Sequence, residues 1–170
     1  MKKLFAALAV AVALTPAATL AQLSLGVEAT LAAPRLGVER MPGSREPLGG
    51  AGDVGGVVLL RLGPLGLGAS MERGLAHSAE RLTTRSAMGG LVADLLPFVR
   101  LELLGEVGVA DLAGDGEGSA RFRGFRPGLS LKLPAFPLRL GLWGLARWGI
   151  PGASSNGPSY GLLARAGIEL

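Results

Sequence analysis

The stretch Phe98–Val109, FVRLELLGEVGV, decides the fold. Its odd-numbered positions are all apolar or glycine, whereas its charged residues, Arg100, Glu102 and Glu106, all fall on even positions. Because side chains of a β-strand point alternately to opposite faces, one face is then free of charge and the other holds every charge. The 3.6-residue period of an α-helix would mix the two sets. The stretch therefore predicts a strand with two contrasting faces.

The same alternation recurs along the chain from Gln22 onward, in eight segments of about ten residues each. The predicted strands are 23–33, 54–62, 65–72, 85–95, 98–109, 121–133, 138–148 and 160–170. Long and short connections alternate between them, so an up-and-down arrangement places every short turn at one end and every long loop at the other. We therefore predict an all-β fold, an eight-stranded antiparallel up-and-down transmembrane β-barrel.

The chain begins with MKKLFAALAVAVALTPAATLAQ. Lys2 and Lys3, the apolar run 4–14 and the small residues ending at Ala21 have the order of a secretory signal peptide. The apolar run is too short to span a bilayer as a helix. We expect residues 1–21 to be a signal peptide and residues 22–170 to form a single barrel domain. The absence of cysteine excludes disulfides and cysteine-based metal sites.

Alternation alone leaves open which face points into the barrel. A soluble, lipocalin-like exported barrel would turn its apolar face inward, whereas a membrane barrel would turn it toward lipid. The polar face is rich in glycine, which makes room for long side chains in a narrow interior. It also carries six acids and seven bases, and an enclosed space requires such a near balance because an unpaired buried charge is costly. We therefore expect the charged face inside.

We predict that these residues form an interior charge network. Its members are Glu28, Arg61, Glu72, Asp94, Arg100, Glu102, Glu106, Arg126, Lys132, Arg139, Arg147, Arg165 and Glu169. Counted from the short turns, most of them divide into a lower and an upper charged layer, and apolar residues that include Leu59, Leu104, Trp143 and Leu163 lie between the two layers.

Aromatic residues fall near the predicted strand ends. Phe98 and Phe136 adjoin short turns, and a second group adjoins the long loops. That second group comprises Phe122, Phe125, Trp148 and Tyr160. Two such rings are typical of the aromatic girdles of membrane barrels. Trp143, at mid-strand on the charged face, is interpreted as a packing plug, and Pro127 predicts a bulge or kink in its strand.

With its signal peptide, eight strands, charged interior and alternating final strand, the chain resembles the small outer-membrane β-barrel proteins of the OmpA transmembrane-domain and OmpX type. The resemblance implies an outer-membrane location, contact with outer-membrane lipid and recognition of the last strand by the outer-membrane assembly machinery. This chain ends in Leu170, where the family usually has an aromatic residue. The match is architectural, so it implies no catalytic residues.

Candidate chemistry is sparse. His77, Ser78 and Glu80 are the one histidine–serine–acid grouping, but neighbouring residues of an extended chain point in opposite directions and supply no catalytic geometry. The acids Asp115 and Glu117 match no calcium-loop spacing. We therefore predict no enzymatic activity, no cofactor and no metal site. The chain has no basic tract despite its pI of 10.3, so we expect no nucleic-acid partner.

The sequence leaves three functions open. We favour a monomeric integral outer-membrane protein with a structural or surface-interaction role through its long loops. The first alternative is a narrow channel or lateral transporter for small apolar molecules, suggested by inward residues such as Val57 and Leu145. The second alternative is the soluble periplasmic ligand-binding barrel.

Overall fold

The computed structural model describes residues 23–32, 52–74, 81–113, 118–133, 136–151 and 157–170. Its strands are β1 (Leu23–Ala32), β2 (Asp53–Leu62), β3 (Leu65–Gly74), β4 (Arg81–Leu96), β5 (Val99–Ala113), β6 (Gly118–Lys132), β7 (Leu138–Trp148) and β8 (Ser159–Glu169). Among these residues, no helix is long and apolar enough to cross a bilayer.

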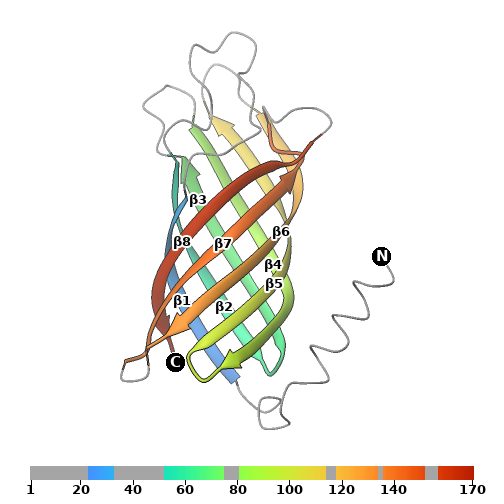
Figure 1. Ribbon diagram of the computed structural model, residues 1–170. Helices are drawn as coiled ribbons and strands as arrows, with labels where there is room; N and C mark the ends of the chain where they lie inside the picture. Colours follow the sequence, from blue (N-terminus) through green and yellow to red (C-terminus); the bar gives the residue numbers. More distant parts are fainter. Residues whose placement is uncertain (1–22, 33–51, 75–80, 114–117, 134–135, 152–156) are drawn as a thin grey trace, which may run out of the picture.

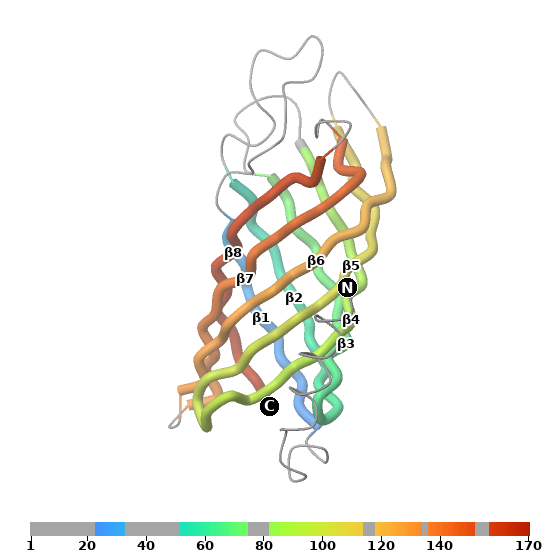
Figure 2. Tube along the Cα trace, turned by 45° about the vertical axis from the view of Figure 1, so that its right-hand side comes forward, coloured from blue at the N-terminus to red at the C-terminus, as the bar shows by residue number. Residues whose placement is uncertain are grey.

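Each strand pairs antiparallel with the next one, and β8 pairs back to β1, so the sheet closes on itself. Leu25 and Leu170 exchange two backbone hydrogen bonds at this seam, of 3.0 and 2.9 Å. The strands wrap obliquely around the barrel, and the C-terminus lies at the end formed by the short turns (Figure 1). Figure 2 shows the same oblique course from a second direction. The predicted eight-stranded up-and-down barrel is confirmed.

We call the end with the short β2–β3, β4–β5 and β6–β7 connections the turn end, and the opposite end the loop end. At the loop end, β4, β5 and β6 are longer than the alternation predicted: β4 starts at Arg81, β5 runs to Ala113 and β6 starts at Gly118. Inward residues of these extensions such as Leu82, Ala110 and Leu112 are apolar, and inward Thr84 is polar, so none of them is charged. The face pattern used to recognise the strands therefore changes there, which is why the prediction ended them early.

The apolar face points outward. Residues such as Val58, Leu67, Leu129, Leu142 and Leu162 expose about half of their surface on the outer wall of the barrel. Most of the charged positions that alternate with them are buried. This orientation is opposite to that of a soluble barrel, which keeps its apolar residues inside.

Pro127 breaks one ladder without shifting its register. It pairs with Leu103 of β5, but Arg126 and Pro127 have no partner residues in β7, although Phe125 and Gly128 on either side keep the same register. Proline lacks the N–H that a ladder bond would need. Of the bulge or kink predicted at Pro127, the bulge does not form, since the strand carries a gap in pairing there without a register shift. The register shift recorded in the described strands lies in β4, next to Asp94.

Candidate functional site: the barrel interior

Two arginines and two glutamates form a closed ring of ion pairs toward the loop end, which we call the upper ring. Arg126 lies 2.7 Å from Glu72 and 2.6 Å from Glu106. Arg147 lies 2.7 Å from Glu72 and 2.6 Å from Glu106. Ser86 donates a further hydrogen bond of 3.1 Å to Glu106. Each arginine therefore lies between two carboxylates, and the ring carries no net charge.

A second set of ion pairs, the lower network, begins at the turn end. Arg61 lies 2.6 Å from Asp94, and Asp94 lies 2.7 Å from Arg100. Arg100 in turn lies 3.0 Å from Glu169, which also contacts Arg139. Asp94 keeps 27% of its side chain exposed, so this part of the network marks the rim of the barrel.

The lower network continues deeper into the barrel through Arg165. This guanidinium lies 2.9 Å from Glu28 and 2.5 Å from Glu102. Arg139 approaches the same two carboxylates at 3.9 and 3.8 Å, which joins them to Glu169. Four arginines thus face four carboxylates in the lower network, and its charge is balanced as well.

Trp143 separates the two ionic layers and is fully buried. Its Nε1 donates a hydrogen bond of 2.8 Å to Glu102, and the guanidinium carbons of Arg165 and Arg126 lie 4.0 and 5.4 Å from its ring centre. Both distances suit cation–π contact. Gly128 on β6 makes this placement possible, because a Cβ there would lie 1.9 Å from the indole Cδ1.

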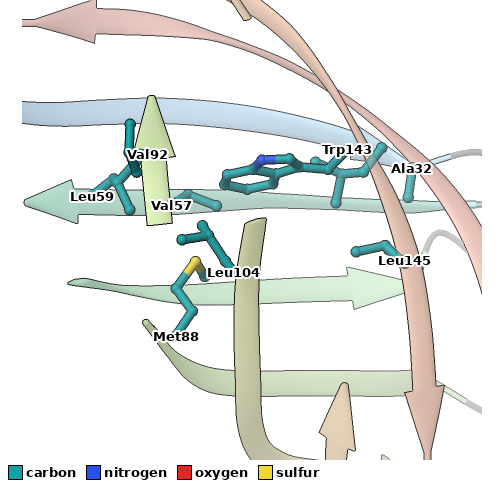
Figure 3. Close-up of a cluster of buried hydrophobic side chains, with 9 residues drawn as sticks. Ala32, Val57, Leu59, Met88, Val92, Leu104, Trp143 and Leu145 are labelled. Atoms are coloured by element: carbon teal, nitrogen blue, oxygen red, sulfur yellow. The ribbon is translucent and has the colours of Figure 1, made fainter. Parts of the chain in front are cut away.

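Apolar side chains complete the layer around Trp143, as Figure 3 shows. The buried cluster comprises Ala32, Val57, Leu59, Met88, Val92, Leu104, Trp143, Leu145 and Leu163. These residues come from β1, β2, β4, β5, β7 and β8, so the layer reaches across the whole interior. An eight-stranded barrel has an interior just wide enough for side chains. The layer therefore closes the barrel between the ionic networks.

A second apolar cluster lies above the upper ring, at the loop end. It comprises Leu82, Ala110, Leu112, Phe122 and Ile150. The girdle position predicted for Phe122 is wrong: the side chain is 4% exposed and the Arg147 guanidinium lies 5.0 Å from its ring centre. Phe122 shares the parity of Gly124 and Arg126, which both belong to the inner face, and this parity was the available signal.

The structure places the predicted network residues as follows. Glu72, Glu106, Arg126 and Arg147 form the upper ring. The residues brought together in the lower network are Glu28, Arg61, Asp94, Arg100, Glu102, Arg139, Arg165 and Glu169. Lys132, the last residue of β6, is exposed at the turn end. Lys132 lies at the open turn end of the barrel, where its side chain is in contact with solvent. It therefore does not take part in the enclosed layers.

Several candidate residues lie outside the described residues. They are His77, Ser78, Glu80, Asp115 and Glu117, together with the predicted signal peptide and residues 34–51 of the first long loop. Within the described strands, no three acidic or histidine side chains gather where they could hold a metal ion. The chemistry available in the interior is therefore that of paired charges around an indole, an arrangement suited to closing the barrel.

Comparisons with known proteins address the fold. No protein-family model matches the sequence, and no curated protein matches it as a relative. The N-terminal β-barrel domain of Pseudomonas aeruginosa OprF superposes with a TM-score of 0.55 at 14% identity, covering 86% of this chain and 97% of that one. Neisserial surface protein A, NspA, superposes with a TM-score of 0.61 at 15% identity, covering 86% and 96%. The chain has the fold of the small eight-stranded outer-membrane β-barrels.

Replacing Glu102 tests whether the interior is dry. Glu102 is 0% exposed and accepts hydrogen bonds from Ser130, Trp143 and Arg165. We expect Glu102→Ala to lower the free energy of unfolding by about 3–5 kcal/mol, because it leaves Arg165 buried with half of its pairing. The measurement is urea unfolding of the folded barrel in lipid vesicles.

The matched control for Glu102→Ala is Asp111→Asn, which removes a carboxylate from the same strand on its outer face. We expect this control to change the free energy of unfolding by less than about 0.5 kcal/mol. Equal stabilities for Glu102→Ala and the wild type would contradict the closed interior, because only solvated charges tolerate the loss of a partner.

Proposed function

We propose that the chain is an integral outer-membrane barrel with a closed interior that acts as a rigid membrane anchor for its loops, in a structural or surface-interaction role. The observation that carries the proposal is the inverted polarity of the barrel: leucines such as Leu129 and Leu142 are exposed outside, whereas Arg126 and Glu102 are fully buried. Exposed apolar area around the middle of the wall is unfavourable in water and favourable in lipid.

The two ends of the barrel support a surface role. The longer connections leave from the loop end: 20, 6 and 10 residues follow β1, β3 and β7, whereas the turn-end connections hold 2, 2 and 5 residues. The connection after β5, with 4 residues, is the exception at the loop end. In outer-membrane barrels the longer loops face outward and the short turns face the periplasm. Residues 1–21, proposed as an export signal, and the assembly machinery that would insert the last strand belong to the same proposal, as does a monomeric state.

The comparison structures support a non-enzymatic role. One is the β-barrel domain of OprF and the other a Neisserial surface protein. With 14% and 15% identity they support the fold and the type of location.

Transport is the second candidate, and one observation favours it. An outward groove adjoins the gap in pairing between β6 and β7 on its turn-end side, and its lining includes Pro127, Gly128, Gly141 and Arg165. Trp143 and Arg165 fill the interior behind this gap. They pack so closely against Gly128 and Gly141 that a Cβ at either glycine would collide with them. The filled interior therefore favours the closed barrel over a conduit.

Electrical recording separates these two candidates. We expect the wild-type protein, folded into a planar bilayer, to show no discrete conductance steps, because the Trp143 layer and the two balanced ionic layers occupy the interior. A shift in gel mobility between heated and unheated samples would establish that the barrel in these preparations is folded. Reproducible steps from folded protein would favour the transport function.

A charge on the outer wall tests whether the wall meets lipid. Leu129, 53% exposed, lies near the middle of the apolar part of β6. We expect Leu129→Arg to lower the free energy of unfolding in vesicles by about 2–4 kcal/mol if this position lies near the bilayer midplane. The control is Ser119→Arg, an exposed outward position at the loop end of the same strand, where the cost should be about 0–1 kcal/mol. Equal, small effects would indicate that the wall faces water.

Protease accessibility tests the orientation. Arg40 and Arg45 lie in the long connection between β1 and β2. We expect trypsin to cleave the protein at these residues on intact cells, because the proposal places the loop end outside. Protection on intact cells, followed by cleavage after the outer membrane is opened, would reverse the orientation.

A further inference from the structure

Among the residues whose side chains the structure describes, four arginines point away from the barrel interior, and neither charged layer includes them. Arg73 on β3, Arg85 on β4, and Arg121 and Arg123 on β6 are all exposed. They alternate with buried inward residues such as Glu72, so their side chains project outward from the wall of the barrel. Within the described residues, none of the four forms an ion pair.

The strand register gathers these arginines on one side of the barrel. Arg85 and Arg121 are both register partners of Val109 on β5, one from each neighbouring strand. Adjacent strands lie about 4.8 Å apart, so the two arginine backbones are about 10 Å apart across β5. Arg123 is the next outward residue along β6, and Arg73 on β3 is paired with Thr83, two residues from Arg85.

The cluster lies at the edge of the apolar wall. The next outward residue toward the turn end is Met71 on β3, Ala87 on β4 and Phe125 on β6. Exposed Met71 and Phe125 begin the apolar wall, which continues with leucines toward the turn end. A lipid whose acyl chains lie against this wall would therefore have its headgroup level with the arginines.

The charge of this cluster is one-sided. Asp111 on β5 is the one carboxylate on the described strands that points outward, and it lies among the four arginines. The neighbouring strands at the same end expose Trp148 on β7 and Tyr160 on β8 instead, and Trp148 is the register partner of Arg123. The cluster therefore has a local excess of positive charge with an aromatic border.

We propose that Arg73, Arg85, Arg121 and Arg123 form a binding surface for the phosphate-bearing headgroup of a lipid in the outer leaflet. This proposal rests on the outer-membrane location proposed above. The planar guanidinium group matches phosphate oxygens with two parallel hydrogen bonds. A lipid is favoured over a soluble polyanion because the arginines project from the side wall, directly at the edge of the apolar surface.

The test uses the whole protein folded into phosphatidylcholine vesicles that contain a small fraction of diphosphorylated lipid A or of the same lipid without phosphates. The amount of each lipid that stays with the protein after mild detergent extraction is measured by native mass spectrometry. We expect the wild type to retain the phosphorylated lipid at least about tenfold better, since one basic residue near an anionic surface contributes roughly fivefold and two of the four arginines would suffice.

The variants separate charge from position. The triple variant Arg85→Gln, Arg121→Gln, Arg123→Gln should lose the preference, and the corresponding triple lysine variant should keep part of it, because lysine retains the charge without the planar geometry. Lys132→Gln removes an exposed positive charge at the turn end and should leave the preference unchanged. Asp111→Asn should strengthen retention, because it removes the negative charge among the arginines.

Three results would overturn the proposal. If the wild type retained both lipids equally, or if the triple glutamine variant kept the wild-type preference for the phosphorylated lipid, the arginines would not bind the headgroup. Displacement of the lipid by soluble heparin, which then binds as tightly, would assign the surface to a soluble polyanion. Failure of the wild type to insert into any vesicle would overturn the outer-membrane proposal as well, so the two failures are distinguishable.

Discussion

The structure depends on charge pairing inside a space too narrow for bulk water. A lone buried guanidinium would cost several kcal/mol, so every arginine of the interior needs a carboxylate within reach. The upper ring meets this requirement with Arg126 and Arg147 placed between Glu72 and Glu106. Because these four residues come from β3, β5, β6 and β7, the pairing requires the barrel to be closed and in one register.

Small residues make the pairing possible. The inner wall offers space for long side chains only where a neighbouring strand carries no side chain. A Cβ on Gly128 would collide with Trp143, and one on Gly141 would lie 2.6 Å from Nε of Arg165. The glycines that would weaken an ordinary sheet thus fix where the indole and the guanidinium lie. The interior is therefore a packed core that happens to be charged.

The outer wall has a complementary organisation. Its middle is apolar, and its loop end divides into arginines on β3, β4 and β6 and aromatic residues on β7 and β8. The distribution of charge thus follows the environment: charges are balanced where they are enclosed, and positive charges outnumber negative ones on the outer wall, where solvent and headgroups can compensate them. Both arrangements follow from the cost of separating a charge from water or from a counter-charge.

The sequence by itself determined the eight strands and the contrast between their two faces, because the period of two is local and survives in every segment. It also indicated which residues would share the interior, since parity along each strand is enough to choose a face. Only the tertiary structure decided the partners, because Arg165 meets Glu28 and Glu102 through strand register and tilt across the barrel. The same holds for the contact between Phe122 and Arg147, and for Arg85 and Arg121, which flank Val109. These residues are distant in sequence, and only closure of the sheet brings them to one level.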